Sequence, residues 1–165
     1  MNKKIIVSIF VGTVVIIGGL IWLGQPVASQ NSSPTNSVES LLKSNENNFD
    51  FGTISMAKGN VSHVFTVANT GTEPIVVKKL YTSCMCTTAT LTNDGKTVGP
   101  FGMPGHASIP SIDVTIAPGA TAQVNAVFDP AAHGPAGIGT ISRVVVLENS
   151  AGKPVEIGFS ANVTP

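Results

Sequence analysis

The C-terminal segment of the chain alternates strictly between apolar positions and polar or small ones. Its apolar positions are Val155, Ile157, Phe159, Ala161 and Val163. Side chains two residues apart lie on the same face of a β-strand, so this pattern predicts a strand with one buried face. No segment of the folded part shows a convincing helical period of 3.6 residues.

The same alternation recurs in segments 61–67, 112–116 and 122–128. Residues 142–147 are apolar on both parities, which predicts a strand covered on both sides. Strands of this length, separated by Gly and Pro, predict an all-β fold: an immunoglobulin-like antiparallel β-sandwich of about seven strands. A small barrel is the alternative. The chain lacks the Cys…Trp…Cys pattern of antibody-type domains.

An apolar run near the N-terminus predicts that one transmembrane helix precedes the sandwich. Residues 5–23 carry no charge and, as a helix, would span about 28 Å, close to the thickness of a bilayer core. Lys3 and Lys4 predict a cytoplasmic N-terminus and an extracytoplasmic remainder. A signal peptide cleaved after Val27-Ala-Ser29 is the alternative.

This gives four regions: a cytoplasmic tail (1–4), a transmembrane anchor or uncleaved signal (5–24), a flexible linker (25–47) and the sandwich (48–165). The linker assignment rests on a composition rich in Ser, Asn and Gln. We therefore expect a single-pass membrane protein whose domain is periplasmic or on the cell surface.

The charge of the chain and its lack of catalytic motifs limit the functions that we expect of it. Without Lys3 and Lys4, the chain has 9 − 2 = 7 basic residues against 9 acidic ones, and no basic stripe, so nucleic acid is not an expected partner. No nucleophile elbow, zinc-protease helix, P-loop or dinucleotide fingerprint is present, so we expect a non-enzymatic protein. The expected contacts are the membrane, through the N-terminal helix, and a protein partner.

The only two cysteines, Cys84 and Cys86, are one residue apart. In an extended segment both sulfurs would point to the same face, with Cα atoms about 6.5 Å apart and parallel Cβ vectors. That geometry disfavours a disulfide and favours two thiols that share a soft metal.

An ordered series of short motifs resembles a bacterial family, the domain-of-unknown-function 1573 family, which is related to ASH/Hydin-type immunoglobulin-like domains. The matching segments are Phe49-Asp-Phe-Gly-Thr-Ile54, Val61-Ser-His-Val-Phe65, Asn69-Thr-Gly71, Ser83-Cys-Met-Cys-Thr87, Ile116-Ala-Pro-Gly119 and Phe128-Asp-Pro130. The resemblance implies an exported β-sandwich and supplies no reaction. Two departures, Met85 between the cysteines and the insertion 99–106, favour a liganding role.

We expect a metal site at Cys84 and Cys86, with Met103, His106 and His133 from Gly/Pro-rich loops as further ligands. These soft donors favour Cu(I), with zinc less favoured. The alternatives are a structural or protein-interaction module in which the cysteines only pack, and a thiol redox protein. A separate histidine, His63, shares parity with apolar neighbours and is interpreted as a hydrogen-bonded core residue.

Overall fold

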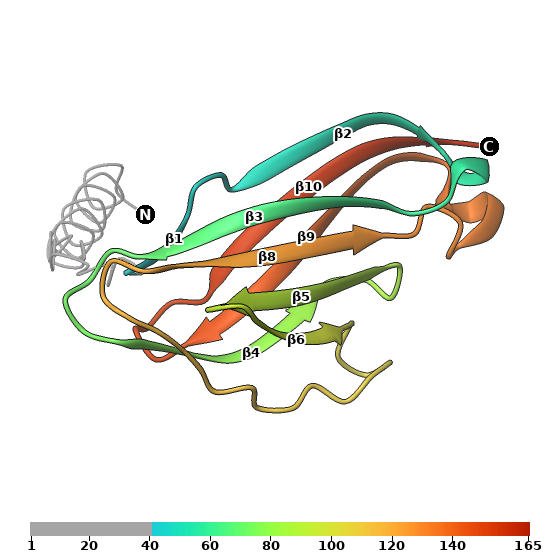
Figure 1. Ribbon diagram of the computed structural model, residues 1–165. Coiled ribbons are helices and arrows are strands. Elements are labelled where there is room, and N and C mark those ends of the chain that lie inside the picture. The colour runs from blue at the N-terminus through green and yellow to red at the C-terminus, as the bar shows by residue number, and fades with distance from the viewer. Residues whose placement is uncertain (1–40) are drawn as a thin grey trace, which may run out of the picture. The chain divides into compact units, whose positions relative to one another are not determined.

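Ten strands form two five-stranded sheets that pack face to face (Figure 1). The computed structural model describes residues 41–165. The strands are β1 (Leu42–Ser44), β2 (Asn48–Ser55), β3 (Val61–Asn69), β4 (Ile75–Thr82), β5 (Thr87–Asn93), β6 (Lys96–Phe101), β7 (Val114–Ile116), β8 (Thr121–Phe128), β9 (Gly139–Asn149) and β10 (Val155–Thr164). One sheet has the order β1-β3-β8-β5-β6 and the other β2-β10-β9-β4-β7. The predicted all-β sandwich is confirmed.

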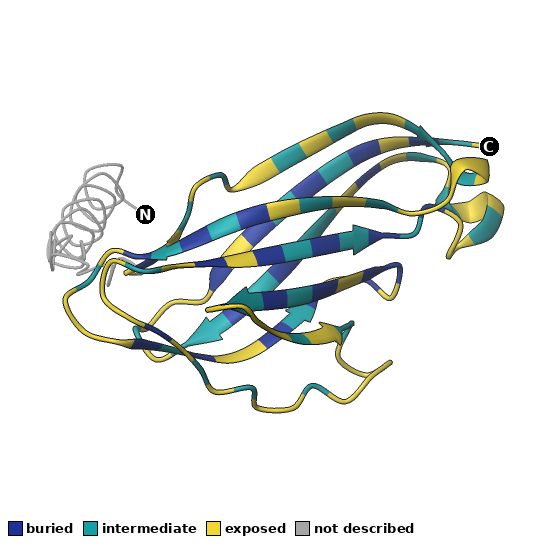
Figure 2. Ribbon diagram, in the orientation of Figure 1, coloured by how far each residue is buried: buried dark blue, intermediate teal, exposed yellow. Residues whose placement is uncertain are grey.

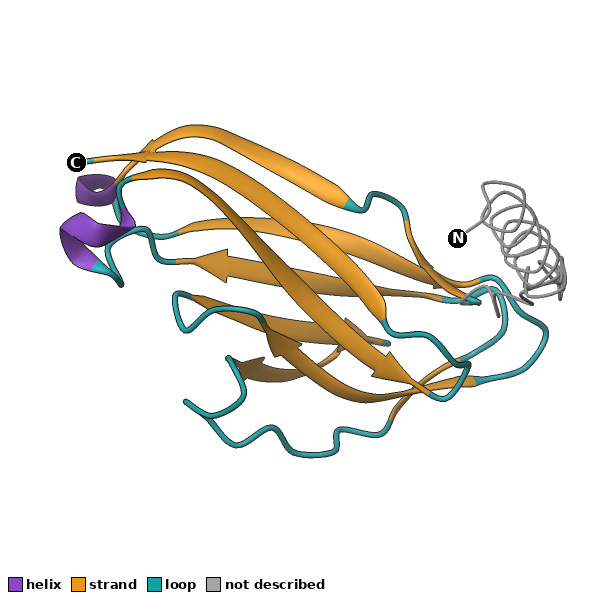
Figure 3. Cartoon of the chain, turned by 180° about the vertical axis from the view of Figure 1, so that it is seen from behind, coloured by secondary structure: helices purple, strands orange, loops and turns teal. Residues whose placement is uncertain are grey.

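Helical structure within residues 41–165 is limited to two short 3-10 helices, η1 (Met56–Lys58) and η2 (Gly134–Gly137), at one end of the sandwich (Figure 3). None of the helices in this part of the chain is long and apolar enough to cross a membrane. The predicted N-terminal anchor lies outside the described residues.

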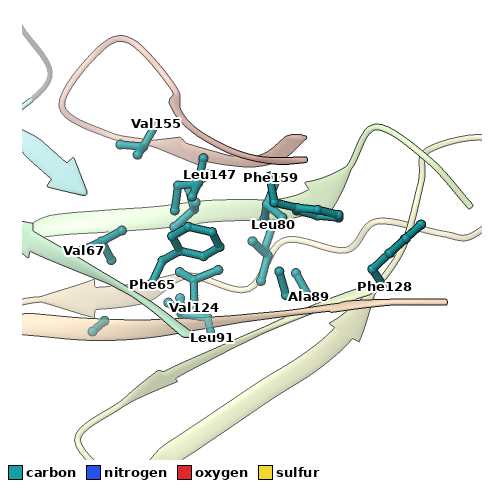
Figure 4. Packing of buried hydrophobic residues seen from close by; sticks show 14 of the residues in the cluster. Phe65, Val67, Leu80, Ala89, Leu91, Val124, Phe128, Leu147, Val155 and Phe159 are labelled. Atoms are coloured by element: carbon teal, nitrogen blue, oxygen red, sulfur yellow. The ribbon is translucent and has the colours of Figure 1, made fainter. Parts of the chain in front are cut away.

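The alternating sequence pattern builds the core. Buried and less buried positions alternate along β3, β8 and β10 (Figure 2), because successive side chains point to opposite faces of a strand. The inner faces of the two sheets meet around Phe65 and Phe159, both fully buried (Figure 4). The predictions from parity for segments 61–67, 122–128 and 155–163 are therefore confirmed.

Five details differ from expectation. The strands number ten rather than about seven, and β2 runs parallel to β10, so the fold is not purely antiparallel. In segment 112–116, only Val114–Ile116 is strand. In β9, Val144 and Val146 are half-buried, so this central strand is covered on one face only. β1 lies before the predicted start of the domain at residue 48, because Leu42 packs into the core.

Two polar residues, His63 and Asn69, make contacts between separate segments of the fold. The imidazole of His63 stacks on Phe49, with centroids 3.6 Å apart, and its Nε2 lies 2.6 Å from Oε1 of Glu46. His63 is thus hydrogen-bonded and half-buried. The buried amide of Asn69 in β3 donates to the carbonyl oxygens of Glu73 and Ile116, which joins one sheet to β7 of the other.

Two connections cross between the sheets at the end of the sandwich where Cys84 and Cys86 lie. One connection, residues 83–86, leads from β4 to β5, and the other, residues 129–138, leads from β8 to β9. A backbone hydrogen bond of 2.8 Å from Asp129 N to Cys86 O joins the two connections.

Candidate functional site

Cys84 and Cys86 lie in the turn between β4 and β5, not in a strand. Their Cα atoms are 5.2 Å apart and their sulfurs are joined as a disulfide. The prediction of an extended pair of free thiols is therefore wrong. Because β4 and β5 belong to different sheets, the chain must bend between Thr82 and Thr87, and this bend brings the two cysteines within bridging distance.

Hydrogen bonds fix the shape of this turn. The buried Thr82 hydroxyl lies 3.0 Å from the carbonyl oxygen of Cys84 and 2.9 Å from that of Thr87. Thr87 N donates to Cys84 O at 3.1 Å. The Ser83 hydroxyl accepts from Val144 N of β9 at 2.9 Å. The turn is thus anchored on both sides, and the sulfurs keep a fixed place at the end of the core.

His133 reaches the disulfide from the β8–β9 connection. Its Nε2 lies 3.2 Å from Cys84 Sγ, although the two residues are 49 positions apart. Asp129 holds this connection through its carboxylate, which accepts from Ala131 N at 2.8 Å. His133 itself is exposed, so the cysteines are approached from solvent on the histidine side.

Arg143 reaches the other sulfur from β9. Its Nε donates to Cys86 Sγ at 3.3 Å, and its Nη1 donates to Ser142 O at 2.8 Å. Within the described residues, no carboxylate lies within 4.0 Å of this guanidinium. Among residues 41–165, the guanidinium therefore has a sulfur and a carbonyl oxygen as partners, and no carboxylate balances its charge.

Arg143 was not predicted as a site residue, although the sequence contains a signal for it. It is the only arginine in the chain and shares strand parity with the buried residues Ile141, Val145 and Leu147. A cation on an apolar stripe is unusual, because an unpaired charge is costly to bury.

The structure brings three of the predicted ligands together. Cys84, Cys86 and His133 have ligand atoms within 4.8 Å of one another, and this is the only such group of His, Cys, Asp or Glu among residues 41–165. His106, which is exposed, is not part of it. Met103 is half-buried, and its carbonyl oxygen accepts from His106 N at 3.2 Å. Their loop still adjoins the cysteine turn, since Thr82 N donates to Gly102 O at 3.1 Å.

Near the turn, Tyr81 carries a perturbed group. Burial raises the pKa of its hydroxyl, and the charge of Glu148 adds to this effect. Tyr81 therefore stays neutral at ordinary pH and adds no charge to the site. The group formed by Cys84, Cys86 and His133 can have two chemistries. When oxidised, it presents an electrophilic disulfide; when reduced, it presents two soft sulfur donors and an imidazole.

Solved structures of low sequence identity share the fold. A protein of unknown function from Porphyromonas gingivalis matches with a TM-score of 0.55 and 13% identity over 79% of this chain. The chain spans about half of that protein, 51% of its length. A family 123 glycoside hydrolase from Clostridium perfringens matches with a TM-score of 0.51 and 8% identity, over 72% of this chain and 23% of the hydrolase. These likenesses concern the fold alone.

An ASH/PapD-like domain of human CEP192 also matches, with a TM-score of 0.47 and 12% identity, over 84% of this chain and 96% of that domain. A search of curated proteins found no match. The model of one family, described as a protein of unknown function (DUF1573), matches residues 42–100, which include the cysteine turn. The resemblance predicted from the ordered motifs is thus confirmed over this segment of the chain.

Proposed function

We propose that this protein is a non-enzymatic binding module that holds one Cu(I) ion at Cys84, Cys86 and His133 when the cysteines are reduced. One observation carries the proposal: two sulfurs and an imidazole nitrogen, from two separate connections of the sandwich, lie within 4.8 Å of one another. Thiolate sulfur and imidazole are the ligands that soft metals prefer.

Charge favours Cu(I) over zinc at this group. Two thiolates and Cu(I) carry a net charge of −1, which the neighbouring guanidinium of Arg143 would neutralise. Zn(II) with the same ligands would be neutral and would leave Arg143 unpaired. Structural zinc also takes four ligands, and no further His, Cys, Asp or Glu joins this group among residues 41–165.

Copper binding requires that the disulfide be opened first. Two thiols of a reductant are oxidised to a disulfide and transfer two electrons to the Cys84–Cys86 bond, which becomes two thiols. Cu(I) then displaces the thiol protons, since the thiolate is the metal-binding form.

The sequence supports the setting of this module. The uncharged run 5–23, preceded by Lys3 and Lys4, favours a membrane anchor with the sandwich outside the cytoplasm. The absence of catalytic motifs supports a binding role over catalysis. A protein partner would receive or deliver the metal.

Anaerobic titration of the reduced full-length chain in detergent micelles, with a chromophoric Cu(I) chelator as competitor, tests the proposal. We expect one Cu(I) per chain, and binding weaker by at least about tenfold for His133→Ala, because even an outer-shell partner of a metal is typically worth 10–100-fold. His106→Ala serves as the matched control and should bind as the wild type does.

Two outcomes would contradict this assignment. A reduced wild-type chain that takes up no Cu(I) would leave only an interaction module. An affinity that depends on His106 and not on His133 would assign the third ligand to the β6–β7 connection instead.

A further inference from the structure

The two sulfurs of the disulfide have different surroundings. Cys84 is 8% exposed and faces the exposed His133, whereas Cys86 is 3% exposed and faces Arg143. Both cysteines are thus buried, and the exposed side of the group is that of His133, next to Cys84.

Charge stabilisation points to the other sulfur as the one that leaves. A disulfide sulfur is a weak hydrogen-bond acceptor, and Arg143 has no carboxylate within 4.0 Å in the described residues. Cleavage of the bond would place a negative charge on Cys86 Sγ, 3.3 Å from the Arg143 guanidinium. The Thr87 hydroxyl, 3.7 Å from the same sulfur, can add a second donor.

Cys84 Sγ has two competing neighbours, the backbone N–H of Cys86 at 3.3 Å and Nε2 of His133 at 3.2 Å, which donates only in the tautomer that carries its proton on Nε2. The amide and a neutral imidazole carry no charge, whereas the Arg143 guanidinium is always charged, and hydrogen bonds from an ionised donor are roughly twice as strong. Negative charge is therefore better placed on Cys86 than on Cys84.

We propose that the Cys84–Cys86 disulfide oxidises external thiols in a directional exchange, in which Cys84 is attacked and Cys86 leaves. The thiolate of an incoming thiol attacks Cys84 Sγ, a new sulfur–sulfur bond forms there, and the Cys84–Cys86 bond breaks with its electron pair on Cys86. A second external thiolate then attacks the incoming sulfur and releases Cys84 as a thiolate. Overall, two external thiols become one disulfide, and their two protons pass to solvent and to the two cysteines.

This activity needs no metal, and it yields the reduced cysteines that the proposed copper site requires. Its substrate class is the thiol, either of low molecular mass or on a polypeptide. Met85 lies between the two cysteines and is 51% exposed, so it offers an apolar contact to the residues that flank a polypeptide thiol.

The test incubates the oxidised full-length chain, in micelles with a metal chelator, with glutathione or with a cysteine-containing peptide. Rapid quenching with an alkylating reagent and fragment mass spectrometry then show which cysteine carries the thiol. We expect the added thiol on Cys84 and the alkyl group on Cys86. An adduct mainly on Cys86, equal amounts on both, or an intact disulfide under excess of either thiol would overturn the proposal.

The role of Arg143 is tested by the rate of disulfide opening at fixed pH. Arg143→Met should slow it by about tenfold to hundredfold, the range expected for a hydrogen bond to a charged group. Arg143→Lys, which keeps the positive charge, should recover a large part of the rate. Lys153→Met removes an exposed cation from the β9–β10 turn and should have no effect.

Equal rates for Arg143→Met and the wild type, with both folded by circular dichroism, would contradict a role for Arg143 in stabilising the leaving sulfur. Copper titration uses protein that is reduced beforehand. A disulfide that resists thiols would therefore overturn the exchange activity and leave copper binding intact, whereas exchange without copper uptake would do the reverse.

Discussion

Serine in place of either Cys84 or Cys86 lowers the Cu(I) affinity of the reduced chain by more than about 100-fold. Each substitution removes one of the two charged sulfur ligands, and even the loss of an outer-shell partner typically costs 10–100-fold in metal affinity. Competition with a chromophoric chelator measures the effect. Both variants lack the disulfide, so circular dichroism must first show that they fold.

Met85→Leu is the matched control, because it changes the residue between the two cysteines and keeps its size. Met85 is 51% exposed at the turn, and we expect its thioether to take no part in the centre, so this variant should bind Cu(I) as the wild type does. An affinity within about tenfold of the wild type for either serine variant would show that the removed sulfur is not a ligand.

Phe159→Ala lowers the free energy of unfolding by about 3–5 kcal/mol, the usual cost of removing a buried phenylalanine ring. The ring is fully buried and packs against Phe51 and Phe128, with centroid distances of 5.5 and 5.6 Å. It also lies opposite Arg143 in the pairing of β10 with β9, so it supports the part of the core beneath the disulfide. Urea unfolding followed by circular dichroism measures the loss.

Val64→Ala is the control for this substitution, since Val64 lies on β3 and is 47% exposed. We expect it to change the free energy of unfolding by less than about 0.5 kcal/mol. A loss below about 1 kcal/mol for Phe159→Ala would contradict the packing of the two sheets around this residue.

Strand periodicity made most of the fold predictable. The stripes that include Phe65 and Phe159 became buried faces because a period of two leaves each side chain only two directions to point. The parallel pairing of β2 with β10 was not predictable, because alternation says nothing about which strands become neighbours.

Three residues of the candidate site were predictable from the sequence, but their geometry was not. Cys84, Cys86 and His133 were expected as ligands from their chemistry. Their arrangement depends on two connections that cross between sheets at the same end, which is a tertiary property. The prediction of an extended backbone at Cys84 was wrong, because the chain changes sheets between Thr82 and Thr87 and must bend there. No Gly or Pro in this segment indicates the bend in the sequence.

The strand position of Arg143 could be read from the sequence, but its partner in the structure could not. The sequence shows that it shares strand parity with apolar residues that are buried. However, the segment is apolar on both parities, which suggested a strand covered on both faces. Only the structure shows that the guanidinium has a sulfur as its partner. A single cation on an otherwise apolar stripe is therefore a reason to look for a polar partner nearby.

In the proposed metal centre, Cys84, Cys86 and His133 bind one ion together. X-ray absorption spectroscopy at the copper edge, on the reduced chain loaded with one Cu(I), measures the neighbours of the metal. We expect two sulfur neighbours and one nitrogen neighbour in the wild type, and loss of the nitrogen in His133→Ala. Copper surrounded only by oxygen and nitrogen, or a nitrogen neighbour that persists in His133→Ala, would contradict the claim.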